Sequence, residues 1–209
     1  MKISVAKFMD KPIKRVLPIW LAIMLPAFLV VYLEPLTQFD FRFHRTLILD
    51  GEWWRLLSGH LDHIGWVHLA LNAIFLALIL FIFDVLKQAA FTVVLWFVSA
   101  LGISLCLLLL SPELIWYVGL SSSLYALLVY GIMLESRLSF FVRIVAVALV
   151  FAKVGFEQGG SMPWVSELIS GPVAEISHLY GAVMGFILAA GVVLLRRPLK
   201  QLLSASTWS

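Results

Sequence analysis

The sequence has few charged residues and almost no cysteine. Charged side chains make up 13% of the 209 residues, against about 25% in ordinary soluble proteins, and Cys106 is the one cysteine. The low charge excludes an ordinary soluble enzyme and a disordered chain, and a single cysteine excludes a disulfide-stabilised scaffold. Hydrophobic residues, in contrast, account for 62% of the chain. This composition is typical of a helical protein that crosses a membrane several times.

Uncharged apolar runs predict an all-α fold of six transmembrane helices in a single domain that covers residues 1–209. Each run approaches the roughly 20 residues that cross the hydrocarbon core of a membrane. The fifth run is the weakest, because it contains Arg143 and Lys153, whose long side chains can reach the membrane surface from near its ends. The predicted spans are Val16–Leu33, Ile64–Phe83, Ala89–Leu110, Leu114–Leu134, Phe140–Phe156 and Ile176–Leu195.

Basic residues are distributed unevenly between the two sides of this predicted arrangement. Eleven of the 15 lysines and arginines lie on the side of the N-terminus, whereas nine of the 12 acidic residues lie on the other side. Lysine and arginine gather on the cytoplasmic side of membrane proteins. We therefore expect both termini in the cytoplasm. The net charge of +3 is explained by this sidedness, so we expect no nucleic-acid partner.

Polar side chains inside three of the predicted spans are the candidate functional residues. Such residues are costly in hydrocarbon and mark functional sites by default. The second, fourth and sixth spans run in the same direction, so their polar residues fall at a similar depth in the outer half of the membrane. The sixth span also carries two glycines four residues apart, which allow close approach of another helix. The residues are His68 and Asn72, Ser121 and Tyr125, and His178 with Gly181 and Gly185.

These residue types at one depth predict nucleophilic catalysis. Ser121 is the candidate nucleophile, and His178 is the candidate base that takes its proton. His68 and Asn72 are candidates to donate hydrogen bonds to the oxyanion, and Tyr125 is expected to pack against the imidazole of His178. Because the spans contain no carboxylate, the sequence favours a Ser–His dyad over a triad.

Each polar residue also has a plainer interpretation. A membrane serine often bonds to a backbone carbonyl, and a lone histidine or asparagine often joins two helices. We interpret His44, His60 and His63 as loop residues on the outer side. Metal binding by His60, His63 and His68 is a lesser alternative, because only Asp62 adds a ligand at suitable spacing. We therefore expect no metal and no cofactor.

Four segments of the sequence resemble motifs of the rhomboid family of intramembrane serine proteases. GLSSSLYALLVYG resembles the family's Gly-x-Ser-Gly segment, with its tyrosine four residues after the nucleophile. HIGWVHLALN resembles His-x4-His-x3-Asn, SHLYGAVMG resembles Ala-His-x2-Gly-x3-Gly, and GEWWRLL resembles the Trp-Arg part of the first outer loop. The resemblance extends from about Gly51 to the end of the sixth span. It implies a rhomboid-like bundle and, for the five catalytic candidates, the roles described above.

The sequence departs from the family pattern at two positions. Ser122 stands where the family has a glycine, and Ser177 stands in place of a smaller residue before the histidine. Three adjacent serines make Ser122 a rival for the role of nucleophile. The spacing to Gly119 and Tyr125 matches the motif only if Ser121 is the nucleophile.

The short chain and its GEWWRLLSGH and WVHLALN segments are similar to the rhombosortase branch of the family. This resemblance implies a serine endopeptidase of the bacterial inner membrane, with its site toward the periplasm. It also implies a transmembrane protein substrate, held among the lipids by a C-terminal anchor with a Gly-Gly-type motif. A rhomboid-like pseudoprotease that binds membrane helices without cutting them is the alternative, and a small transporter is a third interpretation.

Overall fold

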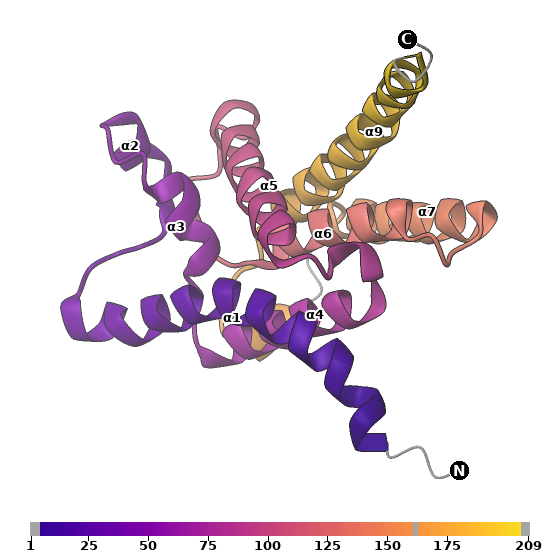
Figure 1. The fold of residues 1–209 in the computed structure, drawn as a ribbon. Coiled ribbons are helices and arrows are strands. Elements are labelled where there is room, and N and C mark those ends of the chain that lie inside the picture. The colour runs from indigo at the N-terminus through magenta and orange to yellow at the C-terminus, as the bar shows by residue number, and fades with distance from the viewer. Residues whose placement is uncertain (1–4, 161–162, 206–209) are drawn as a thin grey trace.

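The computed structural model describes residues 5–160 and 163–205, which form a bundle of helices with one short strand pair (Figure 1). These residues are mostly helical, which confirms the expected helical fold, although β1 and β2 pair antiparallel. The elements are α1 (Val5–Thr37), β1 (Phe43–His44), α2 (Arg45–Leu49), α3 (Arg55–Leu61), α4 (Trp66–Ile82), η1 (Asp84–Leu86), α5 (Ala89–Leu110), β2 (Trp116–Tyr117), α6 (Ser121–Leu134), α7 (Phe140–Glu157), α8 (Pro163–Ile169) and α9 (Glu175–Ala205).

The prediction of six spans is confirmed only in part. α3 and α4 are apolar enough to cross a membrane together, but they meet at an angle of 90°. α6 is apolar but has only 14 residues, and α7 carries three charged residues within its 18. Among the described residues, three helical segments are long and apolar enough to cross a membrane alone: Ile13–Thr37, Ala89–Leu110 and Glu175–Leu195.

The fourth predicted span, Leu114–Leu134, is wrong at its start, because the helix begins only at Ser121. The residues before it are not helical: β2 pairs with β1, and Gly119 has a φ of +117°. The N–H of Gly119 donates a hydrogen bond to the carbonyl of Gly59 at 2.9 Å. This backbone contact with α3 holds the segment extended, so α6 starts at the candidate nucleophile.

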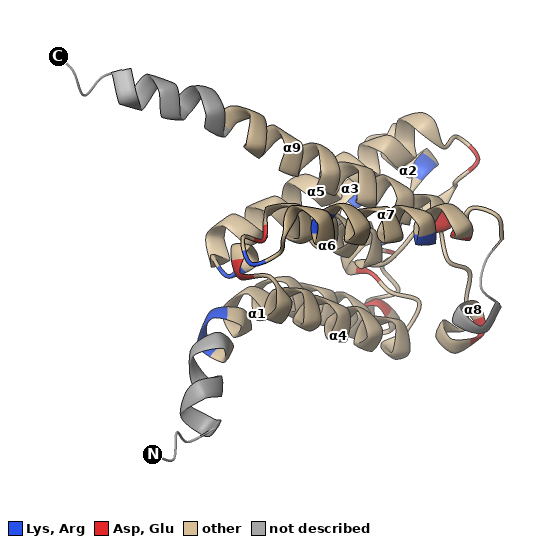
Figure 2. Cartoon of the chain, turned by 90° about the vertical axis from the view of Figure 1, so that its right-hand side faces the viewer, with Lys and Arg blue, Asp and Glu red and all other residues tan. Residues whose placement is uncertain are grey.

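α6 is the central helix of the bundle. It packs against α4, α5, α7 and α9, and most of its side chains are buried. Leu124 and Leu127 of α6 belong to the largest hydrophobic cluster, together with residues of α1, α4 and α5. α1 and α4 lie side by side as one layer against the helices around α6 (Figures 1 and 2). A helix that is apolar on all sides is typical of a protein core or of a membrane span.

Large apolar side chains also cover the outside of the bundle. Leu109, Phe141 and Leu195 are 72%, 74% and 71% exposed. Soluble proteins rarely expose continuous apolar surface of this kind, whereas lipid tails cover it without cost. The exposed apolar surface and the long apolar helices together identify a membrane protein.

A buried carboxylate holds the turn that follows α6. Glu135 is 2% exposed, and its Oε1 accepts a hydrogen bond from Nε of Arg137 at 2.9 Å. Its Oε2 accepts a hydrogen bond from the N–H of Asp84 at 2.6 Å. The hydrogen bond from Arg137 is the main cause that lowers the pKa of Glu135 to about 2. The ionised side chain therefore ties the end of α6 to η1.

Candidate active site

Ser121 and His178 meet at the start of α6. The Oγ atom of Ser121 lies 2.8 Å from Nε2 of His178, although the two residues are 57 positions apart in the chain. His178 is 7% exposed and lies in the first turn of α9. Ser121 is the first residue of α6, so the N–H groups beside it lack partners within the helix. The first turns of two helices therefore bring together a hydroxyl, an imidazole and backbone N–H groups that have no partner in their own helix.

Two glycines of α9 bring that helix into backbone contact with α6. A Cβ atom on Gly181 would lie 2.0 Å from the carbonyl oxygen of Ser122, and one on Gly185 would lie 2.3 Å from that of Ala126. No side chain larger than hydrogen fits at these distances. The close approach places His178, which precedes Gly181 by three residues, against the start of α6.

A cavity of about 250 Å³ opens beside the Ser121–His178 contact. Tyr125 lies one turn after Ser121, and its ring packs against the imidazole of His178 with centroids 4.8 Å apart at 43°. All five catalytic candidates from the sequence thus line one cavity. Its lining consists of His68, Leu71, Asn72, Phe75, Ser121, Tyr125, Ile169, Val173 and His178.

His68 approaches the start of α6 from α4. Its imidazole lies so close to Gly119 that a Cβ atom there would be 2.7 Å from Cε1 and 3.0 Å from Nε2. Asn72, one turn further along α4, donates one amide hydrogen to the carbonyl of His68 at 3.0 Å. Its amide nitrogen carries a second hydrogen. Gly119 therefore serves two purposes, since it has a positive φ and leaves room for His68.

A carboxylate that the sequence did not predict lies behind His178. Oε2 of Glu157, the last residue of α7, is 3.2 Å from Nδ1 of His178. Oε1 of Glu157 is 2.5 Å from Nζ of Lys153, which also donates a hydrogen bond to the hydroxyl of Tyr125. This contact contradicts the premise of the expected Ser–His dyad, which was that no carboxylate lies close to His178. Lys153 was expected to extend to the membrane surface, but its ammonium group contacts Glu157 and Tyr125.

The sequence offers one signal for this contact. Lys153 and Glu157 are four residues apart, a spacing that places opposite charges together on one helix face. The predicted fifth span ends at Phe156, which leaves Glu157 in the outer loop. A fifth span one turn longer would include Glu157. It would still not predict the contact of Glu157 with the imidazole, because His178 lies on another helix, α9.

Ser122 points away from the cavity into a buried polar cluster. Its side chain is fully buried, and its Oγ lies 2.6 Å from the hydroxyl of Tyr117 and 3.4 Å from Nδ1 of His60. The Nε2 atom of His60 lies 3.0 Å from Oγ of Ser104 on α5. The interpretation of His60 as a loop residue is therefore wrong: it lies on α3 and joins that helix to α5 and α6.

The histidines considered for metal binding do not form one group. Both ring nitrogens of His60 contact hydroxyls, whereas His63 packs against His68 with ring centroids 4.9 Å apart. Among the described residues, the acidic groups close enough to share an ion belong to Glu34, Asp40 and Asp62, whose carboxylate oxygens lie within 4.8 Å of one another.

The fold and the apolar surface define the class of this chain as a polytopic helical membrane protein. Residues 50–195, more than half of the chain, match the model of the Rhomboid domain family. The chain therefore belongs to the rhomboid family, which consists generally of intramembrane serine proteases that act on transmembrane substrates. This match confirms the resemblance of the sequence to the rhomboid family. No curated protein matches the sequence.

Proposed function

We propose that the protein is an intramembrane serine endopeptidase with Ser121 as nucleophile and His178 as general base. The observation that carries the proposal is the 2.8 Å contact between Oγ of Ser121 and Nε2 of His178 beside a cavity within an apolar helix bundle. A serine hydroxyl is a poor nucleophile until a base accepts its proton. The contact has the geometry required for that transfer.

The first chemical step forms an acyl-enzyme. The proton of Ser121 moves to Nε2 of His178 while Oγ attacks the carbonyl carbon of the scissile bond. His68, the second amide hydrogen of Asn72 and the N–H of Ser121 are the proposed donors to the oxyanion, and the partial positive charge of the α6 N-terminus adds to them. When the C–N bond breaks, His178 returns the proton to the leaving amine.

Water completes the reaction at the same residues. His178 accepts a proton from a water molecule, whose oxygen attacks the acyl carbon and forms a second oxyanion. The ester bond to Ser121 then breaks, the new carboxylic acid is released, and the proton returns to Oγ. Tyr125 keeps the imidazole in place through both steps by packing on its ring.

We place the site on the periplasmic side of the bacterial inner membrane, with both termini in the cytoplasm. The uneven distribution of basic residues supports this orientation. Where α1 and α9 are drawn in tan in Figure 2, the first turn of α1 and the last turn of α9 lie at the left of the bundle, and α8 lies at the right. Ile169 of α8 lines the catalytic cavity, so the cavity lies next to α8.

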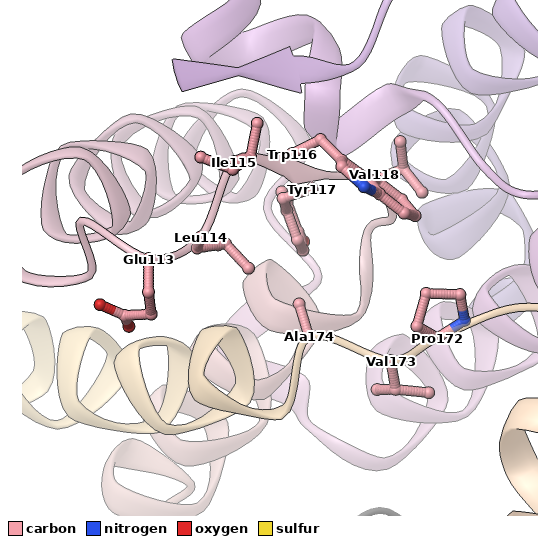
Figure 3. Close-up of a pocket in the computed structure, with 9 residues that line it drawn as sticks. All are labelled: Glu113, Leu114, Ile115, Trp116, Tyr117, Val118, Pro172, Val173 and Ala174. Atoms are coloured by element: carbon pink, nitrogen blue, oxygen red, sulfur yellow. The ribbon is translucent and has the colours of Figure 1, made fainter. Parts of the chain in front are cut away.

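The proposed substrate is a membrane protein with a C-terminal anchor helix and small residues, of the Gly-Gly type, at the cut. The cavity at Ser121 is small and adjoins a second one of about 270 Å³ through Val173, which lines both. Residues 113–118 form one wall of that second cavity, and Pro172, Val173 and Ala174 form the other (Figure 3). The pair of cavities suits an extended peptide segment of small side chains better than an intact helix.

Replacing the small residues at the cut with leucine is expected to slow cleavage of an anchor substrate. Each glycine weakens a helix by about 1 kcal/mol relative to alanine, so leucine keeps the peptide bonds hidden within the helix and crowds the cavity. The measurement is the cleavage rate of a purified anchor protein reconstituted with the enzyme in lipid vesicles. A leucine-to-isoleucine change in the middle of the anchor is the control, and equal rates for all variants would contradict this substrate class.

A fluorophosphonate probe tests the proposed function directly, because it labels only serines with an activated hydroxyl. We expect labelling of the wild-type protein and of Ser122→Ala, and none of Ser121→Ala or His178→Ala. Ser122 is the matched control, since it is the adjacent serine but its hydroxyl faces Tyr117. Labelling of Ser121→Ala together with loss in Ser122→Ala would assign the nucleophile to Ser122. An unlabelled wild-type protein that still binds anchor helices would favour the pseudoprotease.

A further inference from the structure

Glu157 makes two contacts that connect α7 to the catalytic residues. It is 8% exposed, and each of its carboxylate oxygens has its own partner. Oε2 lies 3.2 Å from Nδ1 of His178, and Oε1 lies 2.5 Å from Nζ of Lys153. A buried carboxylate is costly unless such partners satisfy it. Glu157 lies on the side of the imidazole opposite Ser121. Its carboxylate therefore either stabilises the fold or takes part in the reaction of His178.

The hydrogen-bonding capacity of a carboxylate determines the state of the imidazole. An ionised carboxylate only accepts hydrogen bonds, so Nδ1 of His178 must carry the hydrogen in this contact. The lone pair of Nε2 then faces Oγ of Ser121, which is the tautomer that a general base requires. When His178 takes the proton of Ser121, it becomes a cation, and the negative charge of Glu157 lies next to it.

We propose that Glu157 is a positioning residue for His178, so that Ser121, His178 and Glu157 act as a triad within the membrane. This inference rests on the proposed function, because it concerns the base of that same reaction. Glu157 holds the tautomer and ring orientation of His178 and stabilises the imidazolium that forms in each step. It stays ionised and takes no proton.

Lys153 completes this arrangement from one turn earlier on α7. Its ammonium group lies between the carboxylate of Glu157 and the hydroxyl of Tyr125, and its Nζ is 4.7 Å from the centre of the Tyr125 ring. The lysine therefore offsets the charge of Glu157 and links it to the ring that packs on His178. Lys153 thus joins Glu157, which contacts the edge of the His178 imidazole, to Tyr125, which packs on its face.

A purely structural role for Glu157 is the competing explanation. The Lys153–Glu157 pair is an i, i+4 ion pair, and such pairs also stabilise a helix slightly without any part in catalysis. Under that explanation, loss of either partner would have the same small effect on folding and none on chemistry. Under the positioning role, loss of the carboxylate reduces turnover far more than loss of the lysine.

The test measures kcat and KM for an anchor substrate in lipid vesicles, with the melting temperature of each variant. We expect Glu157→Gln to lower kcat by roughly 100-fold or more, at the lower end of what positioned acid–base groups contribute, with KM changed little. Its amide can donate to Nδ1 and stabilise the wrong tautomer. We expect Lys153→Met to lower kcat much less. Glu175→Gln is the matched control with wild-type kcat, because the two ring nitrogens of His178 already contact Ser121 and Glu157.

A double variant provides a readout that a structural role would not produce. In a His178→Ala background, Glu157→Gln should cause no further loss, because residues that act as a unit are not additive. Equal losses of kcat in Lys153→Met and Glu157→Gln, or wild-type kcat in Glu157→Gln, would overturn the positioning role. If Glu157→Gln does not fold, Glu157→Asp replaces it: a lower kcat with unchanged KM supports the role, and wild-type kcat overturns it.

The same experiment separates this inference from the proposed function. If Ser121→Ala and His178→Ala are inactive while Glu157→Gln is fully active, only the positioning role fails. If Ser121→Ala still cleaves the substrate, the proposed function fails, whatever Glu157→Gln does.

Discussion

Replacing Ser121 or His178 with alanine is expected to abolish proteolysis, and the double variant should be no worse than either single variant. In the proposed mechanism the two side chains, which are 2.8 Å apart, share one proton, so removing either one removes the activated nucleophile. The expected loss in kcat is roughly 10,000-fold or more, because one member of such a unit costs about as much as all of them. The measurement is the initial cleavage rate of an anchor substrate at saturating concentration.

The oxyanion candidates provide a graded comparison for this prediction. Loss of one oxyanion donor typically lowers turnover by about 100- to 1,000-fold, so His68→Ala and Asn72→Ala should retain more activity than Ser121→Ala. The melting temperature of each variant must stay close to that of the wild-type protein, so that lost activity does not reflect unfolding. Substantial cleavage by His178→Ala would contradict the assignment of the base, and multiplicative losses in the double variant would contradict a shared role.

The second large effect is expected for Gly181→Ala, which should lower both stability and activity. The new Cβ atom would meet the carbonyl oxygen of Ser122 at 2.0 Å, and a backbone atom within a helix cannot move aside alone. α9 must therefore shift away from α6, which separates His178 from Ser121. Overpacking of this kind typically costs about 1–3 kcal/mol. The measurements are thermal unfolding in detergent and kcat on the anchor substrate.

Gly191→Ala is the matched control on the same helix. A Cβ atom at Gly191 has no neighbour within 4 Å among the described residues, so the same change should leave activity intact. Alanine also favours a helix over glycine by about 1 kcal/mol, so stability should stay the same or rise. Wild-type melting and kcat in Gly181→Ala would show that the close contact of α6 and α9 does not position the site.

Composition and hydropathy by themselves determined that this chain is helical and belongs in a membrane. Charge is too scarce and apolar runs are too long for a water-soluble fold, and the run from Ala89 to Leu110 matches α5 at both ends. The catalytic candidates could also be identified from the sequence, because a polar residue within an apolar run is unusual and can be recognised without knowing the fold. Ser121 and His178 could be named as a pair from residue type, depth and family motif.

Only the tertiary structure decided where α6 begins and what lies behind His178. Hydropathy cannot separate an apolar helix from an apolar extended segment, so the pairing of β2 with β1 and the contact of Gly119 with Gly59 were not visible. The contact of Glu157 with His178 was missed for a related reason. That contact depends on the packing of α7 against α9, which brings Glu157 to Nδ1 of His178 from 21 positions away. Periodicity describes one helix at a time, whereas that contact depends on how two helices are placed relative to each other.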